Sequence, residues 1–143
     1  MFMGEFRHNI DVKGRLIIPA KMREQCGTQV IITRGLDGCL ALYTQDGWAE
    51  YYRQLQTLPK NKKDARNFVR IITSKACECE FDKLGRVNIP NILRKEGKLE
   101  KECVIVGVGD HVEIWNQDVW DEYYDCNKNS LEEFSELLEE LDL

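Results

Sequence analysis

The sequence of 143 residues lacks most of the residues and motifs on which enzyme active sites depend. It contains only two histidines, His8 and His111, and neither has a nucleophile or a second metal ligand at a suitable spacing. The glycine-rich phosphate-binding motifs, the nucleophile elbow of hydrolases and the zinc-protease motif are all absent. We therefore expect a protein that is not an enzyme, with no catalytic residues, no cofactor and no small-molecule substrate.

Cysteines are present but follow no pattern of disulfides or metal ligands. No two of the six stand in a CxxC pair, and the N-terminus lacks the charged-then-apolar order of a secretory signal. We expect them to be reduced and expect no bound metal. The Cys77-Glu-Cys79 spacing leaves a metal or redox site as an alternative, but a half-buried strand has the same spacing. The six are Cys26, Cys39, Cys77, Cys79, Cys103 and Cys126.

Long uncharged apolar runs are also absent, which predicts a cytoplasmic protein with no transmembrane span and no membrane partner. The formal net charge of −5 would disfavour nucleic acid as a partner. However, residues 1–76 carry a net charge of +6 and residues 77–143 a net charge of −11. Because residues 120–143 hold nine acids and one lysine, the rest of the chain has a net charge of +3 and can present a basic face.

One motif occurs twice. Residues 11–23 read DVKGRLIIPAKMR and residues 82–94 read DKLGRVNIPNILR, with Asp, Gly, Arg, Ile, Pro and the last Arg each 71 positions apart. A second matching block, YTQDGWAEYY at 43–52 and WNQDVWDEYY at 115–124, follows at an offset of 72. The chain is therefore a tandem duplication. Since each half has only about 70 residues, near the limit for a lone core, the halves should pack on each other.

Each repeat predicts a mixed α and β unit. In the first repeat, residues 1–58, apolar alternation predicts a strand that turns at Lys13 and Gly14 and returns toward Pro19. Pro19 suits the first turn of a short helix. The expected elements are strands near 6–10 and 16–18, a helix over 20–26 ended by Gly27, strands over 30–32 and 40–43, and a helix from Thr44 to Leu58.

The second repeat, residues 77–127, predicts the same order of elements, with Pro90 starting its short helix and Gly97 ending it. Between the repeats, residues 59–76 predict an amphipathic helix with a basic outer face.

The end of the chain, residues 128–143, predicts an acidic helix opened by a capping box from Ser130 to Glu133. Its apolar stripe needs a partner, either the body of the same chain or another subunit. The stripe consists of Leu131, Phe134, Leu138 and Leu141.

The duplicated turn concentrates a chemistry suited to nucleic acid. A glycine beside an arginine lets the backbone approach another surface and projects a planar, always-charged guanidinium toward phosphate oxygens or the O6 and N7 edge of guanine. Arg15 and Arg86 are the candidates. Asp11 and Asp82, four residues earlier, should bond the turn amides or orient the arginine. The alternative is that each Asp and Arg only brace the turn.

The run DKLGRVNIPNILRKEG resembles the signature of AbrB-type swapped-hairpin DNA-binding domains. The doubled form, with the MFMGEF start, the DARNFVRI helix and both aromatic blocks, is similar over the whole chain to the MraZ family. This resemblance implies an α+β fold, a pseudo-two-fold double swapped-hairpin β-barrel with flanking helices. It also implies a nucleoid-associated bacterial transcriptional regulator. Such a regulator would assemble into a ring and bind guanine-containing direct repeats in double-stranded DNA upstream of its own division and cell-wall gene cluster.

The family's DxxxR motif falls on Asp11 with Arg15 and on Asp82 with Arg86. Lys13 matches in the first copy, whereas the second has Leu84 there and Lys83 one place earlier, so the two turns should not contribute equally. The expected DNA-binding residues are Arg15, Arg86, Lys13, Gly14, Lys83 and Gly85, with Arg23, Arg94 and Lys95 as backbone contacts. The expected structural residues of the motif are Asp11, Asp82, Pro19 and Pro90. The rival interpretation is an assembly factor that binds protein through its acidic C-terminal helix, with purely structural arginine turns.

Overall fold

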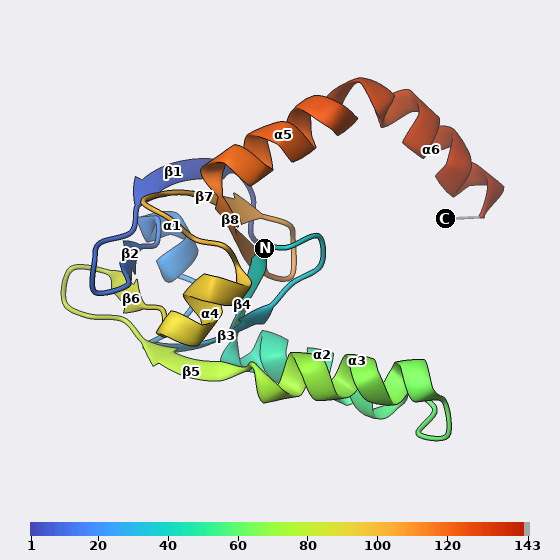
Figure 1. The fold of residues 1–143 in the computed structure, drawn as a ribbon, viewed down its shortest axis with the longest axis horizontal. Helices are drawn as coiled ribbons and strands as arrows, with labels where there is room; N and C mark the ends of the chain where they lie inside the picture. Colours follow the sequence, from blue (N-terminus) through green and yellow to red (C-terminus); the bar gives the residue numbers. More distant parts are fainter. Residues whose placement is uncertain (142–143) are drawn as a thin grey trace.

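The two repeats fold into the same order of elements (Figure 1). The computed structural model describes residues 1–141. The first repeat contains β1 (Glu5–Asn9), β2 (Arg15–Ile17), α1 (Ala20–Arg23), β3 (Gln29–Arg34), β4 (Leu40–Thr44) and α2 (Gln45–Gln56), followed by α3 (Lys63–Ser74). The second contains β5 (Cys77–Glu80), β6 (Arg86–Asn88), α4 (Asn91–Glu96), β7 (Glu102–Gly107), β8 (Val112–Asn116) and α5 (Gln117–Asn127), followed by η1 (Lys128–Ser130) and α6 (Leu131–Glu140).

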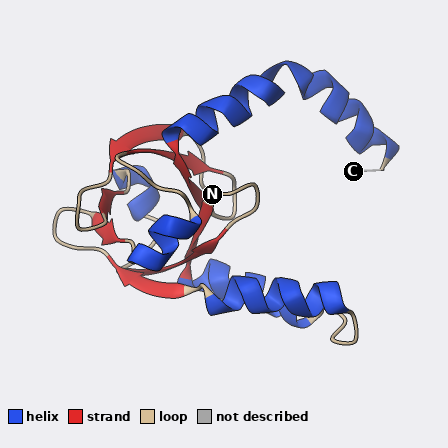
Figure 2. Ribbon diagram, viewed as in Figure 1, coloured by secondary structure: helices blue, strands red, loops and turns tan. Residues whose placement is uncertain are grey.

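The repeats are interlocked in one antiparallel sheet of order β1-β7-β8-β4-β3-β5. The first strand of each repeat pairs with the third strand of the other, β1 with β7 and β5 with β3. The order is therefore unchanged when the two repeats are exchanged, which confirms the predicted α+β fold with pseudo-two-fold swapped hairpins. Strands β2 and β6 pair with each other in a separate ribbon that lies beside β1 and β5 (Figure 2). Val87 of β6 also forms an isolated bridge with Phe81, but the described strands do not close into a hydrogen-bonded barrel.

The β2–β6 ribbon is the second place where the repeats interlock. Leu16 lies opposite its equivalent Val87, and both side chains are fully buried. The backbone N–H of Ile89 donates to the carbonyl of Gly14 at 2.8 Å, and that of Ile18 to the carbonyl of Gly85 at 3.2 Å. Each DxxGR turn is thus held by the strand that follows the other turn.

The main core draws on both repeats, so each half contributes only part of it. The largest fully buried side chains include Leu16, Ile18, Ile32, Leu40, Leu42, Ile89, Leu93, Ile105 and Ile114.

The short helices differ from the prediction at their ends. Helix α1 ends at Arg23 rather than Cys26. After it, the backbone N–H groups bond carbonyls only three residues earlier: that of Gln25 donates to Met22, and that of Cys26 donates to Arg23. Gly97 follows α4 as predicted, but with an ordinary φ of −84°, and Lys98 takes the left-handed conformation instead. Gly97 is needed for packing, since a Cβ there would lie 2.7 Å from Cγ of Leu40.

Helices α2 and α3 form one arm beyond the sheet (Figure 1). The side chain of Thr44 caps α2 as predicted, accepting from the N–H of Gly47 at 2.9 Å. Helix α3 lies within the expected 59–76 segment and is anchored to β3, because the buried Thr33 hydroxyl donates to the carbonyl of Ile72 at 2.7 Å.

Helices α5 and α6 form the second arm. Val119 and Trp120 of α5 pack against Val104 and Trp115 of the sheet, and Asp121 pairs with Arg7 of β1 at 2.8 Å. The predicted capping box is wrong: Ser130 makes no capping bond, because the η1 turn carries α5 almost directly into α6. All residues from 131 to 141 are exposed, so the apolar stripe of α6 does not dock on its own body. No helix in the described part of the chain has the length and apolar character needed to cross a membrane.

Candidate nucleic-acid interface

The first DxxGR turn is braced by its aspartate. One carboxylate oxygen of Asp11 accepts from the N–H groups of Lys13 at 3.0 Å and Arg15 at 2.9 Å. The other accepts from Nε of Arg15 at 2.6 Å. The pKa of Asp11 is lowered, first by the backbone bond from Arg15 and then by its guanidinium. Asp11 therefore both builds the turn and orients Arg15, as predicted for its position.

The second turn repeats this geometry. One oxygen of Asp82 accepts from the N–H groups of Leu84 and Arg86, each at 2.9 Å, and the other from Nε of Arg86 at 2.7 Å. The pKa of Asp82 is likewise lowered, first by the backbone bond from Arg86. In both turns the ion pair uses only Nε, and no acceptor within residues 1–141 bonds the terminal Nη atoms of either arginine. Bracing the turn and presenting the guanidinium are thus compatible.

Both arginines lie on one exposed face of the β2–β6 ribbon. Because strand side chains alternate, Leu16 and Val87 face the core while Arg15 and Arg86 face outward with Ile17 and Asn88. The Arg15 side chain is 35% exposed and the Arg86 side chain 26%. The registry places Arg15 opposite Asn88 and Arg86 opposite Ile17. We call these four residues the ribbon face.

The turn tips carry two of the other predicted cations. Lys13 and Lys83 are exposed, as are their neighbours Val12 and Leu84. Figure 1 shows both turns at the side of the sheet opposite the helical arms. The acidic helix α6 therefore lies away from the basic turns, which explains how a chain of net negative charge presents a locally basic end.

Gly14 and Gly85 are buried, not exposed to a ligand. Both have positive φ, 87° and 78°, which glycine adopts without strain. A Cβ on Gly14 would lie 2.7 Å from the carbonyl oxygen of Ile89 and 2.9 Å from the guanidinium of Arg94. A Cβ on Gly85 would overlap the guanidinium of Arg23. The glycines therefore make room for an arginine from the other repeat.

Arg23 and Arg94 thus stand behind the opposite turns, where sequence reasoning did not place them. Pro19 and Pro90 start α1 and α4, and their carbonyls accept the N–H groups of Arg23 and Arg94, each at 3.0 Å. Nε of Arg23 donates to the carbonyl of Ile18 at 2.8 Å. Nε of Arg94 is buried without an acceptor in the described residues. Lys95 is exposed on α4.

The histidines lie away from the ribbon face. His8 is half-buried on β1, while His111 stacks on Tyr43 with ring centroids 5.0 Å apart. Nδ1 of His111 bonds Asp110 at 2.7 Å, and its Nε2 is 3.6 Å from Glu113. Burial lowers the pKa of His111, but Glu113 and Asp110 outweigh it, so the pKa is raised above its usual value.

We expect His111→Gln to destabilise the protein more at pH 6 than at pH 8. Because the pKa is raised in the folded state, the ion pairs contribute fully below the unfolded pKa of about 6.5 and are lost as pH rises through the folded value. Urea unfolding of wild type and variant across this range measures the difference. His8→Gln is the control, and a loss of stability that is independent of pH would contradict the assignment.

The cysteines are not assembled into a site. Within residues 1–141 all six are free thiols, and no three His, Cys, Asp or Glu side chains are grouped closely enough to hold a metal ion. Burial raises the pKa of Cys26, Cys79 and Cys103 to about 11 and that of Cys39 further. Only Cys126 is exposed.

We therefore expect iodoacetamide at pH 7.5 to label Cys126 first and to leave the four buried thiols unmodified until denaturant is added. The thiolate is the reactive form, and a thiol of pKa about 11 is ionised in fewer than about one molecule in a thousand at this pH. Mass spectrometry of digests locates the label. Rapid labelling of native Cys103 would refute the expectation.

Comparison with known proteins agrees with this duplicated architecture. The family model described as MraZ protein, putative antitoxin-like, matches twice, over residues 1–71 and 72–140. The chain is 52% identical over 143 residues, all of both chains, to the transcriptional regulator MraZ of Ligilactobacillus salivarius. It is 52% identical over 141 residues, 99% of both chains, to the transcriptional regulator MraZ of Desulforamulus reducens. With two matches to the family model that together span residues 1–140, and relatives of this identity over 99% or more of their length, the chain belongs to the MraZ family.

Proposed function

We propose that this protein is a transcriptional regulator that binds DNA sequence-specifically and without catalysis, through the ribbon face and its two flanking turns. The observation that carries the proposal is the placement of Arg15 and Arg86 on one exposed face, each held at Nε, with no acceptor for its Nη atoms among residues 1–141. The major groove of B-DNA admits a two-stranded β-ribbon, and arginine contacts guanine O6 and N7 with two parallel hydrogen bonds. The relatives named as transcriptional regulators support this proposal.

The surrounding cations would position the ribbon on the phosphates. Lys13 and Lys83 at the turn tips and Lys95 on α4 are exposed and can reach the DNA backbone. Arg94 and Arg23 lie one layer behind, against Gly14 and Gly85, where they hold the shape of the turns and add positive charge. We propose that Gly14 and Gly85 leave space for these two arginine side chains and do not contact DNA themselves.

Assembly of several copies would strengthen DNA binding. One ribbon offers few base contacts, whereas several copies on successive direct repeats gain affinity through effective concentration. We therefore propose a ring-shaped homo-oligomer that binds guanine-containing direct repeats upstream of its own division and cell-wall gene cluster. Such a regulator would work in the cytoplasm, associated with the nucleoid.

Salt dependence tests the proposal against a second candidate, an assembly factor that binds protein through α6. That candidate is favoured by the exposed apolar stripe of α6. If Lys and Arg contact phosphates, the logarithm of DNA affinity should fall linearly with the logarithm of salt, with a slope of about −0.9 per phosphate contact. Anisotropy titrations of labelled upstream DNA at four salt concentrations measure this slope. Absence of DNA binding at low salt would favour the assembly factor.

A further inference from the structure

Helix α6 carries an apolar face that no residue in the described range 1–141 covers. Leu131 is 69% exposed, Leu138 48% and Phe134 42%. The equivalent helix of the first repeat differs, because the loop after α2 lets α3 turn back along α2 (Figure 1). In the second repeat η1 leaves no such loop, so α6 continues from the far end of α5 at an angle and does not fold back along it (Figure 1).

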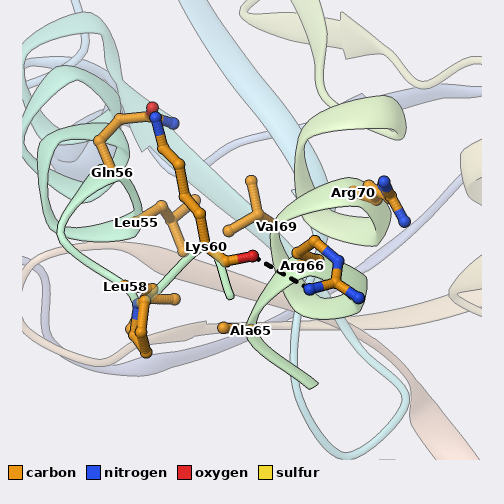
Figure 3. A pocket seen from close by; sticks show the side chains of 9 residues that line it. Leu55, Gln56, Leu58, Lys60, Ala65, Arg66, Val69 and Arg70 are labelled. Carbon is orange, nitrogen blue, oxygen red and sulfur yellow. Dashed lines mark hydrogen bonds between the residues drawn. The ribbon is translucent and has the colours of Figure 1, made fainter. Parts of the chain in front are cut away.

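The α2–α3 arm carries a groove of matching character. The groove has a volume of about 240 Å³, below the range of about 300–1,000 Å³ typical of small-molecule pockets. Figure 3 shows Leu55 and Leu58 from the α2 side facing Ala65 and Val69 of α3. Its lining is completed by Gln56, Pro59, Lys60, Arg66 and Arg70. A mostly apolar floor with a basic rim suits the side chains of an amphipathic helix.

The charges of the two surfaces are opposite. Residues 60–70 contain five cations and one acid, whereas α6 contains five glutamates and no cation. In residues 1–141 no ion pair involves these cations or these glutamates. Each surface therefore has unpaired charge that the other would complement.

We propose that α6 of one copy docks in the α2–α3 groove of a second copy, with the apolar stripe on the groove floor and its glutamates along the basic rim. Spacing of the stripe at 131, 134, 138 and 141 matches the anchor pattern of helix-in-groove recognition. The contact is head-to-tail, because each copy offers its helix to one neighbour and its groove to another. Such a contact generates rings when the rotation closes. This inference rests on the oligomer proposed above and names its interface.

Two variants can break the two halves of the contact separately. Leu138→Asp places a charge in the stripe, and Ala65→Trp fills the groove. Because α6 does not pack on its own body, Leu138→Asp should leave the fold intact. Each variant has a matched control. Glu139→Asp introduces the same aspartate one position further along α6, and Asn67→Trp introduces the same tryptophan on the exposed side of α3. Where Ala65→Trp fails to fold by circular dichroism, Arg70→Glu reverses the rim charge instead.

Light scattering then measures the mass of each protein and of an equimolar mixture. We expect the wild type and controls to be much larger than 16.7 kDa and each interface variant to be a monomer. The mixture should form dimers and nothing larger, because one intact helix meets one intact groove. Variants that stay assembled, a wild-type monomer, or a mixture that stays monomeric would overturn the docking. Binding to single-repeat DNA, measured in parallel, should be unchanged in both variants, so failure of the interface is distinguishable from failure of DNA binding.

Discussion

Replacing Arg15 with alanine should weaken binding to repeat-containing DNA, and more than replacing Arg86 does, while the fold stays intact. Arg15 is the more exposed of the two and lies beside Lys13, whereas the second turn has Leu84 at that position. Loss of a bidentate guanine contact costs about 1–3 kcal/mol of discrimination per site. In an assembly that engages several repeats at once, the loss is repeated at each bound subunit.

Anisotropy titration of both variants against upstream DNA measures this effect. Arg53→Ala is the matched control, because it also removes one exposed arginine. Arg53 pairs with Glu50 within α2, on the arm and away from the ribbon face. Arg15→Lys should be intermediate, since it keeps the charge but loses the planar guanidinium. Wild-type affinity in a folded Arg15→Ala protein would remove Arg15 from the interface.

The second large effect concerns the number of repeats in the DNA. A fragment with one repeat should bind far more weakly than fragments with two or three in correct phase. Linked binding events raise avidity by about 10²–10⁴-fold without any new kind of contact, provided that the geometry permits simultaneous engagement. Titrations of the intact protein against the three fragments, at one salt concentration, measure the gain.

Two controls connect this gain to assembly. Inserting half a helical turn between repeats should abolish it, because the second ribbon would then face the wrong side of the duplex. Leu138→Asp should bind all three fragments with the affinity of the wild type for a single repeat. Equal affinity of the wild type for one, two and three repeats would show that the copies act independently.

Local features of the fold were predictable from the sequence because local residues determine them. Pro19 and Pro90 mark the helix starts, and the offset of 71 positions between the motifs indicates a tandem duplication. Asp11 braces its turn through bonds to residues two and four positions away, a relation visible in the motif itself.

Contacts between distant segments could not be predicted in this way. Arg23 packs against Gly85, 62 positions later, and nothing near either residue indicates it. His111 is isolated in the sequence because its stacking partner Tyr43 lies on β4, far from it along the chain. The Ser130 capping box failed because the preceding helix continues through it, so the N–H groups at the start of α6 do not need a cap.

A gel-shift titration against the DNA upstream of its own gene, with a scrambled sequence of equal length and composition as control, tests the central claim most directly. If the ribbon face reads base edges, the upstream fragment should be bound at least about 10³-fold more tightly at physiological salt, the lower end of the range for specific DNA-binding proteins. Equal affinity for the two fragments would contradict sequence-specific recognition by Arg15 and Arg86.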